Sequence, residues 1–133
     1  MVALTPNRNY LHSDLTSDLT EKIIGAALKV HKQLGLGFIE KLYQRALEIE
    51  LTNNKINLER EKLLKLTYEG VTIGSDKVDF VVDGKVLVEL KAVPELSNVH
   101  RAQLISYLKA SGLKVGLLIN FAQQRLQIKR VIL

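Results

Sequence analysis

KVDFVVDGKVLVELK, residues 77–91, is the stretch of sequence on which the fold of this chain depends. Two apolar runs flank Asp83-Gly84, a dipeptide typical of tight hairpin turns, so the stretch predicts two paired β-strands. Asp79 interrupts the first run, and Glu89 and Lys91 end the second. Polar groups in half-buried strands cost free energy unless something uses them. These three residues are therefore the first candidates for a functional site.

The chemistry of these three side chains points to metal-assisted hydrolysis. Glu89 and Lys91 are two residues apart, so in a strand they share a face. Two acids and a lysine on one face can hold a divalent metal ion and position a water molecule, as hydrolysis of a phosphodiester requires. The competing interpretation is a structural salt-bridge cluster at the edge of a sheet.

The length of the hairpin loop decides whether Asp79 joins Glu89. A two-residue loop would pair Asp79 with Val88 and turn it away from Glu89. A three-residue loop over residues 82–84 would pair Asp79 with Leu87 and place both acids on one face. A bulge near Asp79 would restore the same alignment. The sequence allows all of these, and the functional interpretation requires one of the last two.

Composition indicates one domain. The chain has 133 residues, of which 47% are hydrophobic, enough for a single core. We expect a flexible N-terminal arm over residues 1–15 and one domain over residues 16–133. The absence of cysteine excludes disulfides and thiolate metal sites and fits a reducing cytoplasm. No segment approaches the ~18 apolar residues of a membrane span, and the N-terminus lacks a signal-peptide pattern. We therefore expect a cytoplasmic protein with no membrane partner.

The positive charge is concentrated in the last third of the chain. Residues 1–95 contain 13 basic and 14 acidic side chains, whereas residues 96–133 contain six basic side chains and no acid. A polyanion such as nucleic acid is therefore an expected partner, against the alternative of a solvated basic surface. The side chains expected to contact a nucleic-acid backbone are Lys109, Lys114, Arg125, Lys129 and Arg130.

Helix and strand patterns follow one another in the order α-α-β-β-β-α-β-β. Asp18 and Glu21 resemble a capping box, so the first helix should begin near Asp18 and stop at Gly35. A second helix is expected over residues 38–53, and its inward positions are Phe38, Leu42, Ala46 and Ile49. The other expected elements are 58–68, 77–82, 85–91, 98–110, 115–120 and 125–131, with residues 71–73 as a candidate extension of the sheet. This order predicts an α/β (α+β) fold with a mixed β-sheet flanked by helices.

Several short motifs occur in a specific order and spacing. GFIEKLY, residues 37–43, has the pattern Gly-x-x-Glu-x-x-Tyr, and VELKAV, AQL, YLK and GLLINF follow at residues 88–93, 102–104, 107–109 and 116–121. Over residues 18–131 the chain resembles the GxxExxY protein family, which belongs to the PD-(D/E)XK nuclease superfamily. Each motif is weak alone, and the series together is specific.

The resemblance implies a restriction-endonuclease-like core with a metal site at the edge of the sheet. It places Asp79 at the first acidic position of the superfamily, and Glu89 and Lys91 at its Glu-x-Lys. The ligands implied for Mg²⁺ or Mn²⁺ are Asp79, Glu89 and the backbone carbonyl of Leu90, because these hard ions prefer oxygen. Lys91 would orient the attacking water or stabilise charge on the phosphate.

The resemblance also brings in residues of two helices. Glu40 is implied as a catalytic residue and a further metal ligand, against the alternative that it only favours the helix dipole. Gln103 and Tyr107 follow the Glu-x-Lys on the next helix and, four residues apart, share a face that would look at the site. Tyr43 is expected to support the site as a packing residue with a tethered hydroxyl.

These features together predict a small Mg²⁺-dependent nuclease acting on DNA. The alternatives are a catalytically silent nucleic-acid-binding module with the same fold and an accessory protein that works through protein contacts. Aromatic residues are only 5% of the chain, which disfavours a platform for stacking single-stranded bases. A domain of this size offers little surface for gripping a duplex, so we expect a homodimer.

Overall fold

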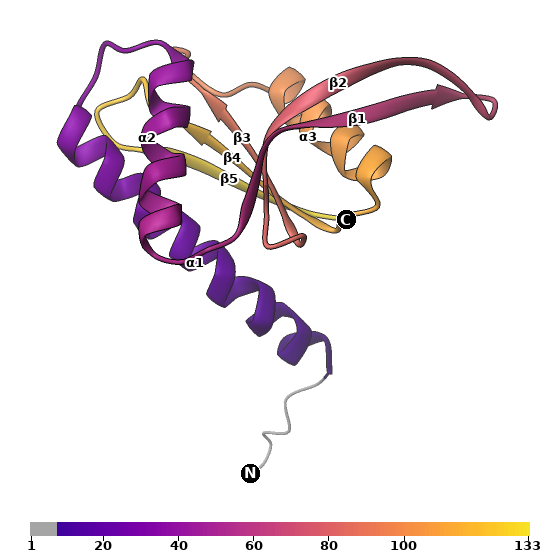
Figure 1. Cartoon of the computed structure of the whole chain (residues 1–133), viewed down its shortest axis with the longest axis horizontal. Coiled ribbons are helices and arrows are strands. Elements are labelled where there is room, and N and C mark those ends of the chain that lie inside the picture. The colour runs from indigo at the N-terminus through magenta and orange to yellow at the C-terminus, as the bar shows by residue number, and fades with distance from the viewer. Residues whose placement is uncertain (1–7) are drawn as a thin grey trace.

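The computed structural model describes residues 8–133, with side chains described from residue 17 onward. The elements follow the predicted order α-α-β-β-β-α-β-β (Figure 1). Their bounds are α1 (Arg8–Leu34), α2 (Glu40–Asn53), β1 (Leu58–Tyr68), β2 (Val71–Val82), β3 (Val86–Lys91), α3 (Asn98–Ser111), β4 (Val115–Asn120) and β5 (Gln127–Ile132). None of the described helices is long and apolar enough to cross a membrane.

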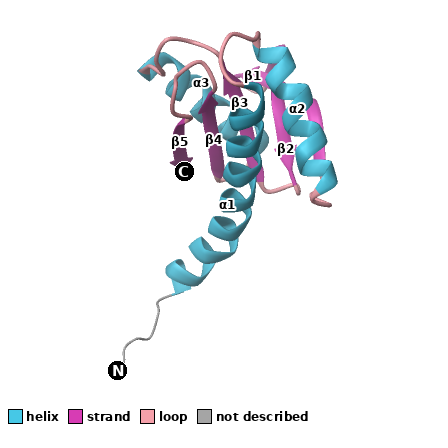
Figure 2. Cartoon of the chain, turned by 90° about the vertical axis from the view of Figure 1, so that its left-hand side faces the viewer, coloured by secondary structure: helices cyan, strands magenta, loops and turns pink. Residues whose placement is uncertain are grey.

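The five strands form one mixed sheet in the order β1-β2-β3-β4-β5. Neighbouring strands are antiparallel except for β3 and β4, which are parallel and are joined through α3. Helices α1 and α2 cover one face of the sheet, where Ile23, Tyr43 and Phe80 belong to one core. Helix α3 covers the other face, where Leu104 and Val78 belong to a second core (Figure 2). The predicted mixed sheet with flanking helices is therefore confirmed.

Helix α3 sits tightly on β4. A Cβ atom built on Gly116 would lie 3.0 Å from Cδ1 of Leu104, so the glycine allows α3 to approach the sheet closely. Ser97 caps the start of the helix together with His100, and Gly112 ends it with φ of 77°, a conformation that glycine adopts without strain. These contacts fix the position of the helix that carries Gln103.

The first helix differs from the prediction at its start. Helix α1 begins at Arg8, rather than near Asp18, and residues 1–7 lie outside the described part of the chain. The Asp18 carboxylate lies 3.4 Å from Nζ of Lys22. The acid therefore pairs with a lysine one turn further on, inside the helix, and does not mark a helix start.

The buried face of α2 also differs from the prediction. Phe38, Leu42 and Ile49 are 42%, 47% and 59% exposed, whereas the buried positions of the helix are Tyr43, Gln44, Leu47 and Leu51. The Tyr43 ring stacks on Phe121 with 4.6 Å between ring centroids. This contact rotates the helix so that Gln44, a polar residue, faces the sheet.

Strands β1 and β2 extend beyond the rest of the sheet as a two-stranded arm. Strand β2 begins at Val71 rather than at Lys77, and only its residues 80–82 pair with β3. The arm, residues 62–78, pairs within itself and projects from the body in Figure 1. It turns at Glu69 and Gly70, whose φ values are 51° and 78°, as a two-residue type I′ hairpin requires.

Candidate active site

The hairpin between β2 and β3 brings Asp79 level with Glu89. Its loop contains three residues, 83–85, because Val82 pairs with Val86 and Phe80 with Val88. The loop is shifted by one residue from the three-residue loop predicted at 82–84, and Asp79 does not lie opposite Leu87 as that loop would require. The observed register still gives the arrangement that the functional interpretation needed, with the two acids side by side.

Strand β2 leaves β3 at Asp79. Val78 belongs to the core under α3 and Phe80 to the core under α1 and α2, although residues two apart in a regular strand share a face. The alternation of faces therefore breaks at Asp79. On β1, Glu61 stands between the positions paired with Val78 and Phe80 and has φ of 53°. Both strands are thus distorted where the arm begins.

Side-chain hydrogen bonds replace the strand ladder at this point. The backbone N–H of Asp79 donates to Oε1 of Glu89 at 2.8 Å, and the N–H of Leu90 donates to Oδ2 of Asp79 at 2.7 Å. Each carboxylate is therefore held by the backbone of the other strand. Nε2 of Gln44 donates to Oδ1 of Asp79 at 2.9 Å, which fixes the remaining oxygen of that acid.

Burial makes both acids difficult to ionise. Burial, reinforced by the charge of Asp79, raises the pKa of Glu89 to about 8. Burial also raises the pKa of Asp79, against the lowering effect of the hydrogen bond from Leu90 and with a further increase from Glu40. Burial and the neighbouring carboxylate both oppose the ionisation of each acid. A cation that binds to such a pair therefore gains much binding energy.

Lys91 and Gln103 complete the α3 side of the site. Nζ of Lys91 lies 3.9 Å from Oε2 of Glu89 and donates to Oε1 of Gln103 at 3.2 Å. Tyr107, four residues after Gln103, donates its hydroxyl to Asp76 at 2.6 Å. Burial, with this hydrogen bond, raises the pKa of Tyr107. The structure thus brings Gln103 to Lys91 and ties Tyr107 to the arm.

The start of α2 brings Glu40 toward the end of β3. Oε2 of Glu40 accepts the backbone N–H of Ala92 at 3.4 Å, next to Lys91. Tyr43 is buried, and its hydroxyl donates to the carbonyl of Gly35 at 2.6 Å. Tyr43 therefore anchors the loop that leads into α2, at a distance from the acids themselves.

An open cavity of about 250 Å³ lies between α2 and the base of the arm. Sequence reasoning missed four of its six lining residues. Gln44 could have been found, because it follows Glu40 by four residues and so lies on the same helix face. Glu61 gives no sequence signal, since its position depends on the distortion of β1. The lining residues are Glu40, Lys41, Gln44, Glu61, Lys77 and Asp79.

The five basic residues predicted to contact nucleic acid do not gather on one face. Lys129 and Arg130 are consecutive on β5 and so point to opposite faces of the sheet, and Arg130 donates to Oγ of Ser17 at 3.2 Å. Arg125 follows β4 at the end of the sheet that holds Lys91, whereas Lys114 precedes β4 at the other end. The fifth residue, Lys109, lies in the last turn of α3.

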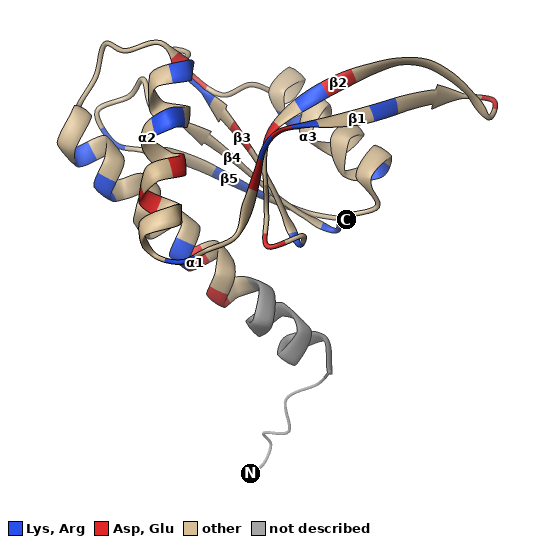
Figure 3. Cartoon of the chain, in the orientation of Figure 1, with Lys and Arg blue, Asp and Glu red and all other residues tan. Residues whose placement is uncertain are grey.

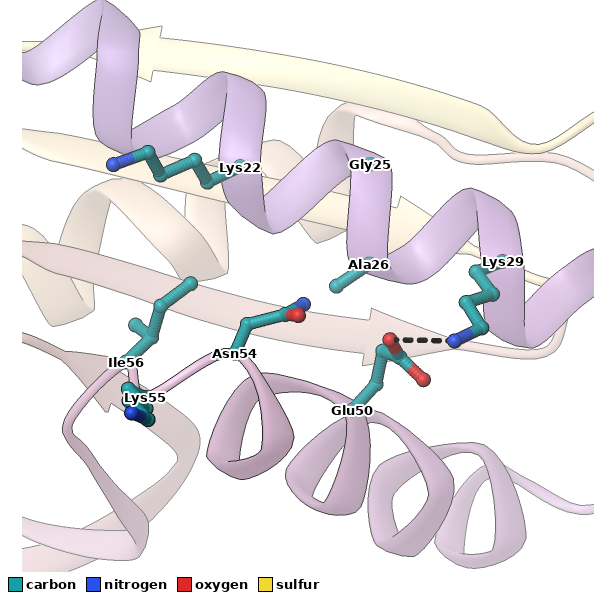
Figure 4. Close-up of a pocket in the computed structure, with 8 residues that line it drawn as sticks. All are labelled: Lys22, Gly25, Ala26, Lys29, Glu50, Asn54, Lys55 and Ile56. Atoms are coloured by element: carbon teal, nitrogen blue, oxygen red, sulfur yellow. Dashed lines mark ion pairs between the residues drawn. The ribbon is translucent and has the colours of Figure 1, made fainter.

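A larger cavity of about 590 Å³ lies between α1 and the C-terminal end of α2 (Figure 4). It is remote in the fold from Glu40, which begins α2, and contains none of the predicted residues. Lys29 in its wall is paired with Glu50 at 3.2 Å. We therefore place the candidate site at the two acids of the sheet and not in this cavity.

The residues at the two acids fit a magnesium-like ion. The described part of the chain holds no group of three or more histidine, aspartate or glutamate side chains that could bind a metal by itself. Mg²⁺ is usually bound through one or two carboxylates, with waters and substrate phosphates filling its other positions. Asp79 and Glu89, with the backbone carbonyl of Leu90, match that donor set.

Comparison with known proteins identifies the family. Residues 17–131 match the model of the PD-(D/E)XK nuclease superfamily, and no curated protein matches the chain. The crystal structure of SSO0001 is similar in fold, with a TM-score of 0.57 and 23% identity over 70% of this chain and 50% of that one. An alkaline exonuclease from Laribacter hongkongensis gives a TM-score of 0.52 and 12% identity over 69% of this chain and 55% of that one.

The chain thus spans about half the length of these two solved structures, and their likeness to it is one of fold. The family match covers most of the chain, including the hairpin of Asp79 and Glu89, the lysine that follows them and α3. This protein belongs to the PD-(D/E)XK nuclease superfamily.

Proposed function

We propose that this protein is a Mg²⁺- or Mn²⁺-dependent nuclease of the GxxExxY type that hydrolyses phosphodiester bonds in DNA. The observation that carries the proposal is the reciprocal pair of hydrogen bonds by which Asp79 and Glu89 are held together where β2 leaves β3. A structural salt-bridge cluster would place a cation between the acids. Here, among the described residues, Lys91 pairs with Glu89 alone, at 3.9 Å between Nζ and Oε2, and the contacts that join the two acids come from backbone N–H groups.

The proposed roles follow from these positions. Asp79, Glu89 and the Leu90 carbonyl would hold the ion, which when bound supplies charge neutralisation at the phosphate and a more acidic water. Lys91, only 16% exposed, keeps its ammonium beside the acids and would orient the attacking water or stabilise charge on the phosphate. Gln103 holds that ammonium in place by accepting its hydrogen bond.

Three further residues support the site in this proposal. Glu40 lines the same cavity as Asp79 and, at the first turn of α2, could complete the ligand set from the side opposite α3. Tyr107 would act through Asp76, to which it is bonded, and so would hold the arm against α3. Tyr43 would support the loop before Glu40.

The nature of the substrate and the assembly are part of the same proposal. The alkaline exonuclease has the same fold, and the net charge of +5 favours a polyanionic substrate. We propose DNA as that substrate, a homodimer as the assembly that grips it, and the cytoplasm as the location, in keeping with the absence of cysteine.

The test is cleavage of a panel of linear, nicked, branched and single-stranded substrates with Mg²⁺ or Mn²⁺, comparing wild type with Lys91→Ala. The proposal expects cleavage by the wild type that requires metal and is lost in the variant. Binding without cleavage of any substrate would favour a silent nucleic-acid-binding module. Absence of both binding and cleavage would favour an accessory protein that works through protein contacts.

A further inference from the structure

One face of the arm carries two lysines in line with the candidate site. Lys77 lies directly opposite Leu63, and Lys65 lies directly opposite Ser75. Residues opposite each other and two apart along antiparallel strands share a face. Leu64, the residue between Leu63 and Lys65, is buried in the core under α3. The strand positions of the two lysines are therefore on the face away from α3. Lys65, on the edge strand β1, also lines a cavity that it shares with Ser106 and Lys109 of α3.

This face continues directly from the site. Lys77 lines the same cavity as Asp79 and Glu40, and Lys65 lies further out on the arm. Figure 3 shows basic positions on both strands of the arm. Ser75, opposite Lys65 on the same face, is exposed. A ligand that occupied the cavity and extended outward would therefore pass over both lysines.

The charges of these two lysines are not neutralised within the protein. Among the residues that the structure describes, neither Lys65 nor Lys77 is in an ion pair, whereas Lys41 pairs with Glu61 and Lys62 with Glu59. The nearby acid Asp76 is engaged by the Tyr107 hydroxyl and the Lys77 backbone N–H. An anionic partner would therefore find two available ammonium groups on an extended strand surface that also exposes Leu63.

The spacing along the arm matches a nucleic-acid strand. Strands rise ~3.3 Å per residue, so Lys77 and Ser75 lie about 7 Å and 13 Å beyond Asp79 along β2. One strand of B-DNA advances ~3.4 Å per nucleotide, and 13 Å then corresponds to about four nucleotides. We infer that the arm holds the phosphate backbone of the substrate up to about four nucleotides from the candidate site, through Lys77 and Lys65. The inference rests on the proposed function.

Salt dependence of binding is the first test. Metal-free binding to a fluorescent duplex would be measured by anisotropy over a range of salt concentrations for wild type and for Lys65→Gln with Lys77→Gln. The matched control is Lys32→Gln with Lys85→Gln, which changes net charge equally away from the arm. Two lost phosphate contacts should flatten the slope of log K against log salt by about 1.8, and the control slope should match wild type.

Cross-linking is the second test and uses the absence of cysteine in this chain. Ser75→Cys introduces a single thiol on the inferred face, and Thr52→Cys introduces one near the C-terminal end of α2, away from the arm. Both replaced residues are exposed. A photoreactive group attached to the thiol should cross-link to the duplex from position 75 and not from position 52.

The outcomes separate the arm from the proposed function. The role of the arm would be overturned by an unchanged slope in the arm variant, or by equal cross-linking from both positions. The proposed function would still stand in that case, provided that the wild type binds DNA. No binding by the wild type would overturn both. Loss of a dimer mass in the arm variant, with its DNA slope unchanged, would assign the face to a second copy of the chain instead.

Discussion

Replacing Glu89 by glutamine should stabilise the metal-free protein at alkaline pH. Glu89 is 6% exposed, and burial beside Asp79 raises its pKa from 4.5 to about 8. Glutamine keeps the shape and can still accept the N–H of Asp79, but it carries no charge to be buried. The variant therefore removes the cost of ionisation and little else.

The sign and size of this difference in stability follow from proton linkage. Between pH 4.5 and about 8 the unfolded chain loses the Glu89 proton while the folded chain retains it, so stability falls as pH rises through this window. One pKa unit corresponds to about 1.4 kcal/mol, so the full cost is on the order of 5 kcal/mol. Below pH 4.5 both states are protonated, and wild type and Glu89→Gln should be equally stable.

The assay is urea unfolding of both proteins at pH 4 and pH 8.5 with a chelator present. The variant should be more stable at pH 8.5 by several kcal/mol and equal to wild type at pH 4. Mg²⁺ should then narrow the difference in stability at pH 8.5, because only the wild type gains the binding energy, about 2.7 kcal/mol at one hundred times the Kd. A variant that is less stable than wild type at pH 8.5 without metal would refute this reasoning.

Three other predictions follow from the same contacts. Asp79→Asn should keep its affinity for DNA and lose metal-dependent cleavage, and cleavage equal to wild type would assign the activity elsewhere. Tyr43→Phe removes the hydrogen bond to Gly35 and should cost about 1 kcal/mol in urea unfolding; an unchanged midpoint would contradict the anchoring role of the hydroxyl. Light scattering at tens of micromolar should give a dimer mass, and a monomer mass with and without DNA would contradict the proposed homodimer.

The order of elements could be predicted from the sequence because most local signals agree with the final structure. Strands β1 and β4 have the predicted bounds, and α3 begins at the predicted residue 98. In the outer part of β2, residues 71–73 were expected to extend the sheet, and residues 74–76 were missed because Gly74-Ser75-Asp76 interrupts the apolar pattern. That part lies in the arm, where both faces are largely exposed, so burial imposes no alternation on it.

The candidate site could be predicted only in part. Asp79, Glu89 and Lys91 stand out because polar residues interrupt or end apolar strands. The register that joins the two acids depends on a loop of residues 83–85, and Asp83 adopts φ of 53° in it. Such a conformation is tolerated by aspartate but is not dictated by it.

The rotation of α2 was the main error, and it concealed a residue of the site. The apolar residues Leu42 and Ile49 suggested one face, but Tyr43 packs on Phe121, which lies far along the chain. Gln44 is consequently buried and donates to Asp79. A tertiary contact of this kind overrides helical periodicity, and it cannot be predicted from the sequence pattern of α2 alone.

Calorimetric titration of Mn²⁺ into the metal-free protein shows whether Asp79 and Glu89 together hold a divalent ion. We expect one ion bound per chain in the wild type, with proton release on binding because the pKa of Glu89 is raised. Asp79→Asn should lose this binding, and Lys85→Gln, at the other end of β3, should retain it. Absence of binding to the wild type, or equal binding to Asp79→Asn, would rule out a metal site at these two acids.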